Sequence, residues 1–333
     1  MDRPSFLPPR GALSRRGFVL AALAWPAAGS GAAVVIVPAD SSASHRPLVF
    51  PADHAAHPDT RIEWWYVTGW LRTVGAREIA ERPDFGFQVT FFRTRTGLAS
   101  GSPSRFAATQ LVFAHVALTD LSATRPTASL QDQRVARAGF GIASVPGPDD
   151  KPQVVRLGDW IFEREIAATA DAPTTLRIGV HSDRYAFDFT LHGTQPLLLQ
   201  GDAGYSRKGP LATEASRYYS EPQLAVSGRL DLPGRVSRQV TGRAWLDHEW
   251  SDEYLAPEAV GWDWIGFDLF DGSALMAFRL RQRDGSTFWA GGSWRDPVGR
   301  SRTFEPGEIA FEPRRSWTSP RTGTRYPVEW EVS

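Results

Sequence analysis

The sequence contains no cysteine, only two lysines and only two methionines in 333 residues. The absence of cysteine excludes disulfides, thiolate metal sites and a cysteine nucleophile, so stability must come from burial of the core. Acidic and basic residues balance at 37 each. Because no excess of basic charge exists, no basic surface typical of nucleic-acid binding is expected.

Several motifs of common enzyme classes are also missing. The sequence has no G-x-S-x-G elbow, no P-loop and no G-x-G-x-x-G turn, which argues against α/β serine hydrolases and nucleotide-dependent enzymes. It also lacks the H-x-H and H-E-x-x-H patterns that commonly bind zinc. We therefore expect no metal site and no cofactor.

The N-terminus resembles a signal for twin-arginine (Tat) export. Residues 14–20 read S-R-R-G-F-V-L, and an apolar run followed by small residues comes after them. A membrane anchor is the alternative, but the run is shorter than the roughly 20 residues needed to span a bilayer. We therefore expect residues 1–33 to be a cleaved signal peptide and the mature protein to be periplasmic.

Alternation of apolar and polar residues with a period of two dominates the rest of the chain. In residues 62–71 Glu63, Trp65 and Val67 share one face, whereas Trp64 and Tyr66 share the other. Asp-Gly pairs at 271–272 and 284–285 separate further alternating runs, which is typical of antiparallel hairpins. With 42% hydrophobic and 12% aromatic residues, this pattern predicts an all-β fold.

A break in the alternation suggests two domains. Residues 201–222 are rich in Gly, Ser and Pro, so we place a boundary near residue 225, between domains 34–225 and 226–333. The second domain offers about seven strands, one or more fewer than a closed eight-stranded barrel needs. We therefore expect an open second barrel, with an apolar gap beside the final strand 326–332, or a truncated one.

Three residues are candidates for acid–base chemistry. Glu63 lies among indoles on a predicted inward face, where burial would raise the pKa of its carboxyl and make it a general acid. The alternative is a salt bridge to an inward arginine. In the segment Asp247-His248-Glu249, two carboxylates two residues apart would share a proton, and His248 would titrate near neutral pH. We therefore predict Glu63, Asp247 and His248 as catalytic.

Aromatic residues and one histidine are candidates for ligand binding. His115 follows the apolar residues Leu111 and Phe113, and the alternative is a hydrogen-bonded core histidine. The aromatic residues would line an apolar pocket, although structural roles or stacking on a carbohydrate remain open. The predicted ligand-binding residues are Trp65, His115, Tyr219, Trp250 and Trp264.

With these residues in view, the chain resembles the family of AttH proteins and carotenoid 1,2-hydratases (hydroxyneurosporene synthases). The resemblance covers most of residues 50–295 in several motifs that occur in the same order. The matching blocks are Glu63 to Gly69, Phe87 to Arg93, Gln110 to His115 with Ala117, Gln200 to Gly209, Tyr218 to Ser220, Gly242 to Ser251, and Gly261 to Trp264.

This resemblance implies two tandem lipocalin-like antiparallel β-barrels and a pocket for an apolar molecule. In the hydratases a carbon–carbon double bond is protonated and water is added, and His248 and Trp250 match the residues implicated. Phe278 and Leu280 stand where the family has a tyrosine and an aspartate. We therefore expect an exported protein that binds an apolar or isoprenoid-like molecule and acts as a hydro-lyase or cyclase. The alternative is a non-catalytic accessory of a membrane ABC transport system.

Overall fold

The computed structural model describes residues 46–75, 82–98, 101–121, 129–166, 173–253, 255–320 and 322–333. The signal peptide expected at residues 1–33 lies outside this part of the chain. Throughout the described residues the fold is all-β, with two short 3-10 turns, η1 (Ala52–His54) and η2 (Pro306–Glu308). None of these described segments forms a helix long and apolar enough to cross a membrane.

Thirteen antiparallel strands form the largest sheet, sheet A. Its order is β4-β3-β2-β1-β13-β12-β9-β8-β7-β6-β5, and the short strands β10 and β11 also pair with β12. The strands are β1 (Ile62–Thr73), β2 (Phe85–Arg95), β3 (Gln110–Asp120), β4 (Leu130–Arg137), β5 (Ala143–Ser144), β6 (Gln153–Leu157), β7 (Trp160–Glu165), β8 (Thr175–His181), β9 (Ala186–His192), β10 (Leu198–Leu199), β11 (Tyr205–Arg207), β12 (Ala215–Asp231) and β13 (Arg238–Ser251).

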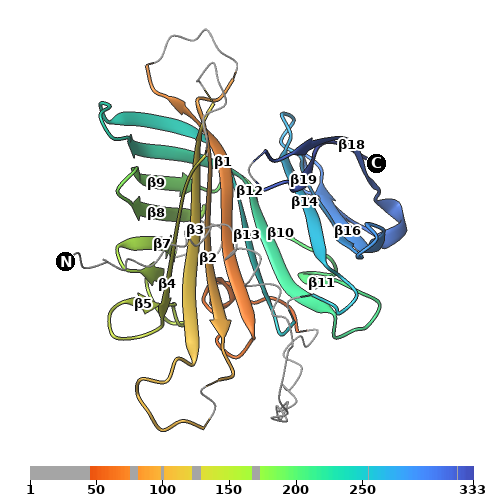
Figure 1. Ribbon diagram of the computed structural model, residues 1–333, viewed down its shortest axis with the longest axis horizontal. Coiled ribbons are helices and arrows are strands. Elements are labelled where there is room, and N and C mark those ends of the chain that lie inside the picture. The colour runs from red at the N-terminus through yellow and green to blue at the C-terminus, as the bar shows by residue number, and fades with distance from the viewer. Residues whose placement is uncertain are drawn as a thin grey trace, which may run out of the picture. The chain divides into compact units, whose positions relative to one another are not determined.

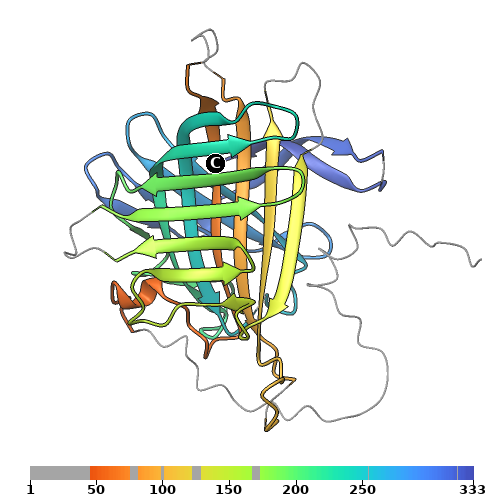
Figure 2. The ribbon, with the colours of Figure 1, turned by 90° about the vertical axis from the view of Figure 1, so that its left-hand side faces the viewer.

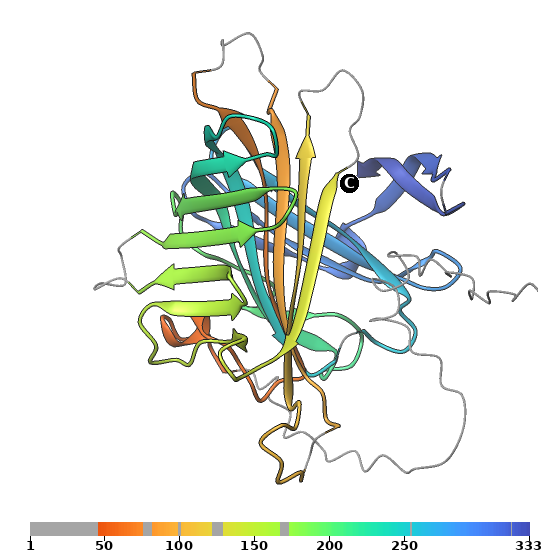
Figure 3. The same cartoon turned by 60° about the vertical axis from the view of Figure 1, so that its left-hand side comes forward.

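Sheet A folds over on itself and encloses an apolar core. Figures 2 and 3 show β5 to β9 running across the long strands β1 to β4. The two edges of the sheet approach each other through the turn that joins β4 to β5, where Gly139 bridges to Ala143. This nearly closed barrel confirms the all-β, lipocalin-like prediction.

The alternation seen in the sequence determines which side chains fill the barrel. On β1, Trp65, Val67 and Leu71 are buried in the core, whereas Tyr66 and Thr68 on the opposite face are only partly buried. Each such large apolar side chain contributes about 1.5–3 kcal/mol when it is fully buried. The faces predicted for residues 62–71 are therefore confirmed.

A β-bulge in β12 keeps its inward face continuous. The register with β13 shifts between Glu221 and Leu224, and Gln223 has a φ of 61°. Pro222 cannot donate a ladder hydrogen bond, which favours a bulge at this point. As a result Tyr219 and Leu224 both face inward although their positions differ by an odd number, which would put them on opposite faces of a regular strand.

Two smaller sheets follow β13. Sheet B packs against the outer face of sheet A, where Tyr218 of β12 and Trp245 of β13 join its apolar cluster (Figure 1). Sheet B has the order β14-β15-β16-β17 with β14 and β17 as edges, so among the described strands the second barrel is open, as predicted. The final strand is not at an edge of sheet B, however, because β18 and β19 form a separate two-stranded sheet, sheet C. The strands of sheets B and C are β14 (Gly261–Asp268), β15 (Ala274–Arg281), β16 (Thr287–Arg295), β17 (Ser301–Phe304), β18 (Phe311–Thr318) and β19 (Arg325–Val332).

The structure does not divide at the predicted position near residue 225. This residue lies in the middle of β12, and β13 returns to pair with β1. The Gly- and Pro-rich residues 201–214, which suggested the boundary, instead connect β10 and β11 to β12 within sheet A. Sheet A therefore ends at Ser251, and the segment 252–260 is the connection to sheet B.

Candidate functional site

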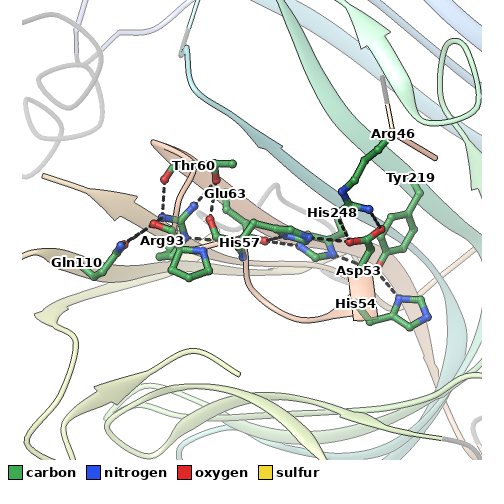
Figure 4. A network of polar contacts seen from close by, with 11 residues as sticks. Arg46, Asp53, His54, His57, Thr60, Glu63, Arg93, Gln110, Tyr219 and His248 are labelled. Atoms are coloured by element: carbon green, nitrogen blue, oxygen red, sulfur yellow. Dashed lines mark hydrogen bonds and ion pairs between the residues drawn. The ribbon is translucent and has the colours of Figure 1, made fainter. Parts of the chain in front are cut away.

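Glu63 lies at the centre of a buried polar network on the inner face of sheet A. Its side chain is fully buried and forms an ion pair with Arg93 of β2, with 2.9 Å between Nε and Oε2. Both strands place these residues inward by alternation, next to the short turn η1. Figure 4 shows the full set, which we call the Glu63 network: Arg46, Asp53, His54, His57, Thr60, Glu63, Arg93, Gln110, Tyr219 and His248.

The hydrogen bonds of the Glu63 network define the tautomers of two histidines. An ionised carboxylate only accepts hydrogen bonds, so Nε2 of His248 donates to Oε1 of Glu63 over 2.9 Å. Nδ1 of a neutral His248 must then accept the Tyr219 hydroxyl proton at 3.0 Å. The Tyr219 oxygen in turn accepts a hydrogen bond from Nδ1 of His54 at 2.7 Å. A continuous donor–acceptor chain thus connects His54 to Glu63.

A second histidine connects Glu63 to the surface. His57 Nδ1 lies 2.7 Å from Oε1 of Glu63, and its Nε2 lies 3.3 Å from Oδ1 of Asp53. Asp53 forms an ion pair with the half-exposed Arg46 at 2.6 Å. The His57 ring also stacks on Trp250, with 3.7 Å between the ring centroids. The network therefore extends from the barrel interior to solvent.

Burial and hydrogen bonding act in opposite directions on these groups. Burial alone would raise the pKa of Glu63, but hydrogen bonds from His248 and His57 hold the pKa well below its usual range. Burial lowers the pKa of His248 to about 4, so this ring is neutral. For His57, burial opposes the positive charge, but hydrogen bonds to Asp53 and Glu63 outweigh it and raise the pKa.

Glu63 is therefore ionised, and the raised pKa predicted for its carboxyl is wrong, whereas its catalytic role stays a prediction. The alternative of a salt bridge to an inward arginine is what the structure shows. The sequence placed the carboxyl among indoles correctly, and Trp65 does stack on His248 at 4.8 Å. Alternation in the sequence could not reveal that Arg93 and the imidazoles of His57 and His248 face the Glu63 carboxylate.

Among the described residues, three side chains of the Glu63 network lie close enough together to be considered as metal ligands. One ligand atom from each of His57, Glu63 and His248 lies within 4.8 Å of the other two. However, both imidazoles already hydrogen-bond to Glu63, and the Arg93 guanidinium occupies its second oxygen. This arrangement fits a proton-sharing network better than a cation site, because Arg93 would repel a metal ion.

Asp247 and His248 point to opposite faces of β13, so the three predicted catalytic residues do not form one site. His248 points into the barrel toward Glu63, whereas Asp247 faces sheet B. The two residues are adjacent in the chain, and neighbours along a strand point to opposite faces, so alternation alone separates them. Glu249 shares the outer face with Asp247 and forms an ion pair with Lys208 at 3.0 Å.

Asp247 lies in a separate buried cluster of aromatic side chains, which we call the Asp247 site. Its Oδ1 accepts hydrogen bonds from Ser220 Oγ at 2.6 Å and from Trp245 Nε1 at 2.7 Å. The indole of Trp264 on β14 donates to the Tyr218 hydroxyl at 3.1 Å. The residues of the site are Tyr66, Tyr218, Ser220, Trp245, Asp247 and Trp264.

Within the described residues no arginine, lysine or histidine forms an ion pair with Asp247, whose hydrogen-bond donors include Ser220 and Trp245. Burial raises the pKa of Asp247 to about 7, and hydrogen bonds from Ser220, Trp245 and Tyr218 only partly oppose this effect. Asp247 is therefore largely protonated below neutral pH, when its carboxyl has a proton to donate. The behaviour expected of Glu63 is found at this residue instead.

The predicted ligand-binding residues divide among three places. Trp65, Tyr219 and Trp250 line the Glu63 network, and Trp264 belongs to the Asp247 site. His115 lies apart on the outer face of β3, beside Phe92 and Phe113. The structure does not bring His115 together with the other candidates.

Sequence reasoning missed the contribution of the segment before β1. Asp53, His54 and His57 precede the first strong strand and were not considered. The spacing H-x-x-H directly before an inward glutamate was the available signal. Arg93 was also missed, although it follows the alternating run of β2 on the inward face.

Two surface pockets accompany these sites. One, of about 400 Å³, lies at the end of the barrel where β2 begins, and the other is about 370 Å³. Neither lining includes Glu63, His248 or Asp247. The second lining includes Leu255, which packs against the apolar cluster of sheet B.

Comparisons with known proteins agree with this architecture. A crystal structure assigned as AttH from Nitrosomonas europaea is 46% identical, covers 87% of this chain and 82% of its own, and superposes with a TM-score of 0.75. Kievitone hydratase from Nectria haematococca is 14% identical, covers 88% of this chain and 78% of its own, with a TM-score of 0.60, and shows that the two share a fold. No curated protein matches the sequence.

The family model described as AttH-like matches residues 41–333, which include both described sites. This range and the 46% identity to an AttH structure confirm the resemblance drawn from the sequence motifs. The chain belongs to the AttH-like family.

Proposed function

We propose that the protein hydrates an apolar, isoprenoid-like molecule at the Asp247 site, with Asp247 as the acid. The observation that carries this proposal is the position of its carboxyl, buried to 3% exposure between Ser220 and Trp245 and surrounded by aromatic rings. A carboxylic acid in such surroundings keeps its proton near neutral pH, and the raised pKa of Asp247 agrees with this state.

The chemistry balances with water as the only co-substrate. The π electrons of a terminal C=C bond take the Asp247 proton, which leaves a tertiary carbocation and an aspartate. The aromatic rings of Trp245 and Tyr218 stabilise the cation by cation–π attraction. A water oxygen then bonds to the cation, and one water proton returns to the carboxylate, which gives a tertiary alcohol and restores the acid.

Access to the carboxyl requires movement of β14. Trp264 is only partly buried and lies on the edge strand of sheet B, which pairs on one side only with β15. A ligand that displaces this indole reaches Asp247 from the edge. Phe278 and Leu280 stand where the hydratases have a tyrosine and an aspartate. They pair with Trp264 and Trp262 of β14, and Phe278, Leu280 and Trp264 belong to the apolar cluster of sheet B. Because neither Phe278 nor Leu280 can donate a proton, we assign the acid of this site to Asp247.

The test is hydration of a defined probe. Purified protein is incubated with lycopene or squalene in ¹⁸O-labelled water, and the products are analysed by mass spectrometry. We expect a tertiary alcohol that contains ¹⁸O, and we expect Asp247→Asn to abolish its formation while probe binding persists. Asp183→Asn, at an exposed position outside the site, is the control and should retain activity.

Formation of the alcohol by Asp247→Asn at the wild-type rate would contradict the assignment. Binding of the probe without any product in the wild-type protein would instead favour the second candidate, a non-catalytic carrier. That candidate is favoured by one observation: Asp247 is covered, and neither surface pocket includes it. Such a carrier would serve a membrane ABC transport system, which is the alternative function that the resemblance to AttH proteins implies.

We also propose export through the Tat pathway to the periplasm. The support is the S-R-R-G-F-V-L sequence at residues 14–20. Replacement of Arg15 and Arg16 by lysine should retain the full-length precursor in the cytoplasm of the producing bacterium, as measured by fractionation and immunoblotting. Unchanged periplasmic accumulation of the processed protein would reject this proposal.

A further inference from the structure

The larger pocket lies at the end of the first barrel that is remote from the Glu63 network. It is bordered by Phe85, the first residue of β2, whereas Arg93 of the network lies eight residues further along the same strand. At roughly 3.4 Å per residue, the two ends are about 27 Å apart. This pocket is therefore distinct from both sites described above.

The wall of the pocket changes from apolar to cationic between its floor and its rim. Phe85 and Leu118 are fully buried residues of the barrel core, whereas Arg184 and Arg235 are exposed. The remaining lining residues are Asp120, Leu130, Leu232 and Pro233.

The rim has an excess of positive charge. Its charged residues are two arginines and Asp120, and Asp120 pairs with Arg235 at 3.1 Å. The guanidinium of Arg184 donates a hydrogen bond to the backbone carbonyl of Gln131, and within the described residues it has no carboxylate partner. A guanidinium has five N–H donors and binds a carboxylate with two of them, so Arg184 retains donors for a ligand.

From this arrangement we propose that the barrel mouth binds a single-chain amphiphile with a carboxylate headgroup, such as a fatty acid. Its alkyl chain contacts Phe85 and Leu118 on the floor, and its headgroup pairs with Arg184 at the rim. The pocket volume of about 400 Å³ lies within the range of small-molecule sites. Arg184, which forms no ion pair within the described residues, matches one carboxylate.

The test compares two probes of the same chain length, laurate and dodecanol, by isothermal titration calorimetry on the mature protein. We expect laurate to bind more tightly than dodecanol. Replacement of Arg184 and Arg235 by glutamine should weaken laurate binding about tenfold, because a hydrogen bond to a charged group is lost, and should leave dodecanol binding unchanged. Both arginines are exposed, so this variant is expected to fold.

Two further variants locate the bound chain. Leu232→Asp places a charge in the lining and should remove binding of both probes, whereas Leu211→Asp in the second pocket is the matched control and should not change it. Asp247→Asn should also leave laurate affinity unchanged, which separates this proposal from the proposed hydration. The proposal is overturned if laurate does not bind, if Arg184→Gln/Arg235→Gln retains full laurate affinity, or if Leu211→Asp removes binding.

Discussion

At the scale of single residues, two buried carboxylates on neighbouring strands of one sheet have opposite protonation states. Glu63 is ionised because Arg93 and two histidines contact it. Asp247 retains its proton because its donors, a hydroxyl and an indole, are neutral and do not supply the positive charge that would stabilise a buried carboxylate. Burial is similar in the two cases, so the partners decide the state. The sequence revealed which residues are acidic and buried, but not which partners face them.

The raised pKa of Asp247 predicts a stability change with pH. Its folded pKa of about 7 exceeds the ordinary value of 3.8, so the native state holds an extra proton between these pH values. The stability contributed by this residue is therefore fully present below pH 3.8, falls as the pH rises toward the folded pKa, and is lost above about pH 7. Since Asp247→Asn cannot ionise, its stability relative to wild type should increase by about 3 kcal/mol between pH 5 and pH 8.

Urea unfolding at a series of pH values measures this difference. Asp183→Asn, an exposed residue, serves as the control and should follow the wild-type profile. Parallel profiles of wild type and Asp247→Asn would show that Asp247 ionises normally in the native state.

Glu63 is ionised, in contrast to Asp247, so neutralising it should destabilise the protein. Glu63→Gln removes the charge that compensates the fully buried Arg93, and an uncompensated buried ion typically costs about 3–5 kcal/mol. We expect a loss of that size in urea unfolding at pH 7. The exposed pair of Arg314 and Glu331 gives a control, since Glu331→Gln should have no measurable effect. A loss below about 1 kcal/mol for Glu63→Gln would contradict an ionised Glu63.

At the scale of strands, period-two alternation could be predicted and register could not. Alternation places His248 and Trp250 on one face of β13 and Trp245 and Asp247 on the other, and the structure agrees. Which face is the barrel interior depends on the strands that pair with β13. Those are β12, which directly precedes it, and β1, which lies far earlier in the chain. The bulge at Gln223, which determines the inward face of β12, was also invisible to alternation.

Pairing of β1 with β13 depends on close backbone approach at Gly242. A Cβ on this residue would lie 1.9 Å from the Trp70 carbonyl oxygen, which belongs to the backbone and cannot move alone. Gly242→Ala should therefore force the two strands apart and destabilise the protein by about 1–3 kcal/mol or more. Gly86→Ala is the matched control in the same sheet, because its nearest neighbour is 3.8 Å away. Equal thermal unfolding of the two variants would argue against this register.

At the scale of the whole described chain, β12 and β13 contribute to two cores. Their inner residues pack in the barrel, and Tyr218 and Trp245 on their outer faces pack with sheet B. The family resemblance correctly indicated two lipocalin-like modules. The boundary was misplaced because a Gly- and Pro-rich loop is as common within a domain as between domains, and only strand pairing distinguishes the two cases.

Shared strands imply that sheet B is not an independent folding unit. The segment 252–333 expressed alone lacks Leu198, Tyr218 and Trp245, three members of its apolar cluster. We expect this segment to show no cooperative unfolding transition by circular dichroism, whereas the full chain unfolds cooperatively. A sharp thermal transition of the segment would show that its own residues suffice for a core.

The most direct test of the account is the protonation state of Asp247, measured by infrared difference spectroscopy of wild type against Asp247→Asn. We predict a carboxylic-acid C=O band in the wild-type protein at pH 6 that is absent from the variant and disappears with a midpoint near pH 7. Absence of this band at pH 6, with only carboxylate absorption assigned to Asp247, would contradict its role as the acid.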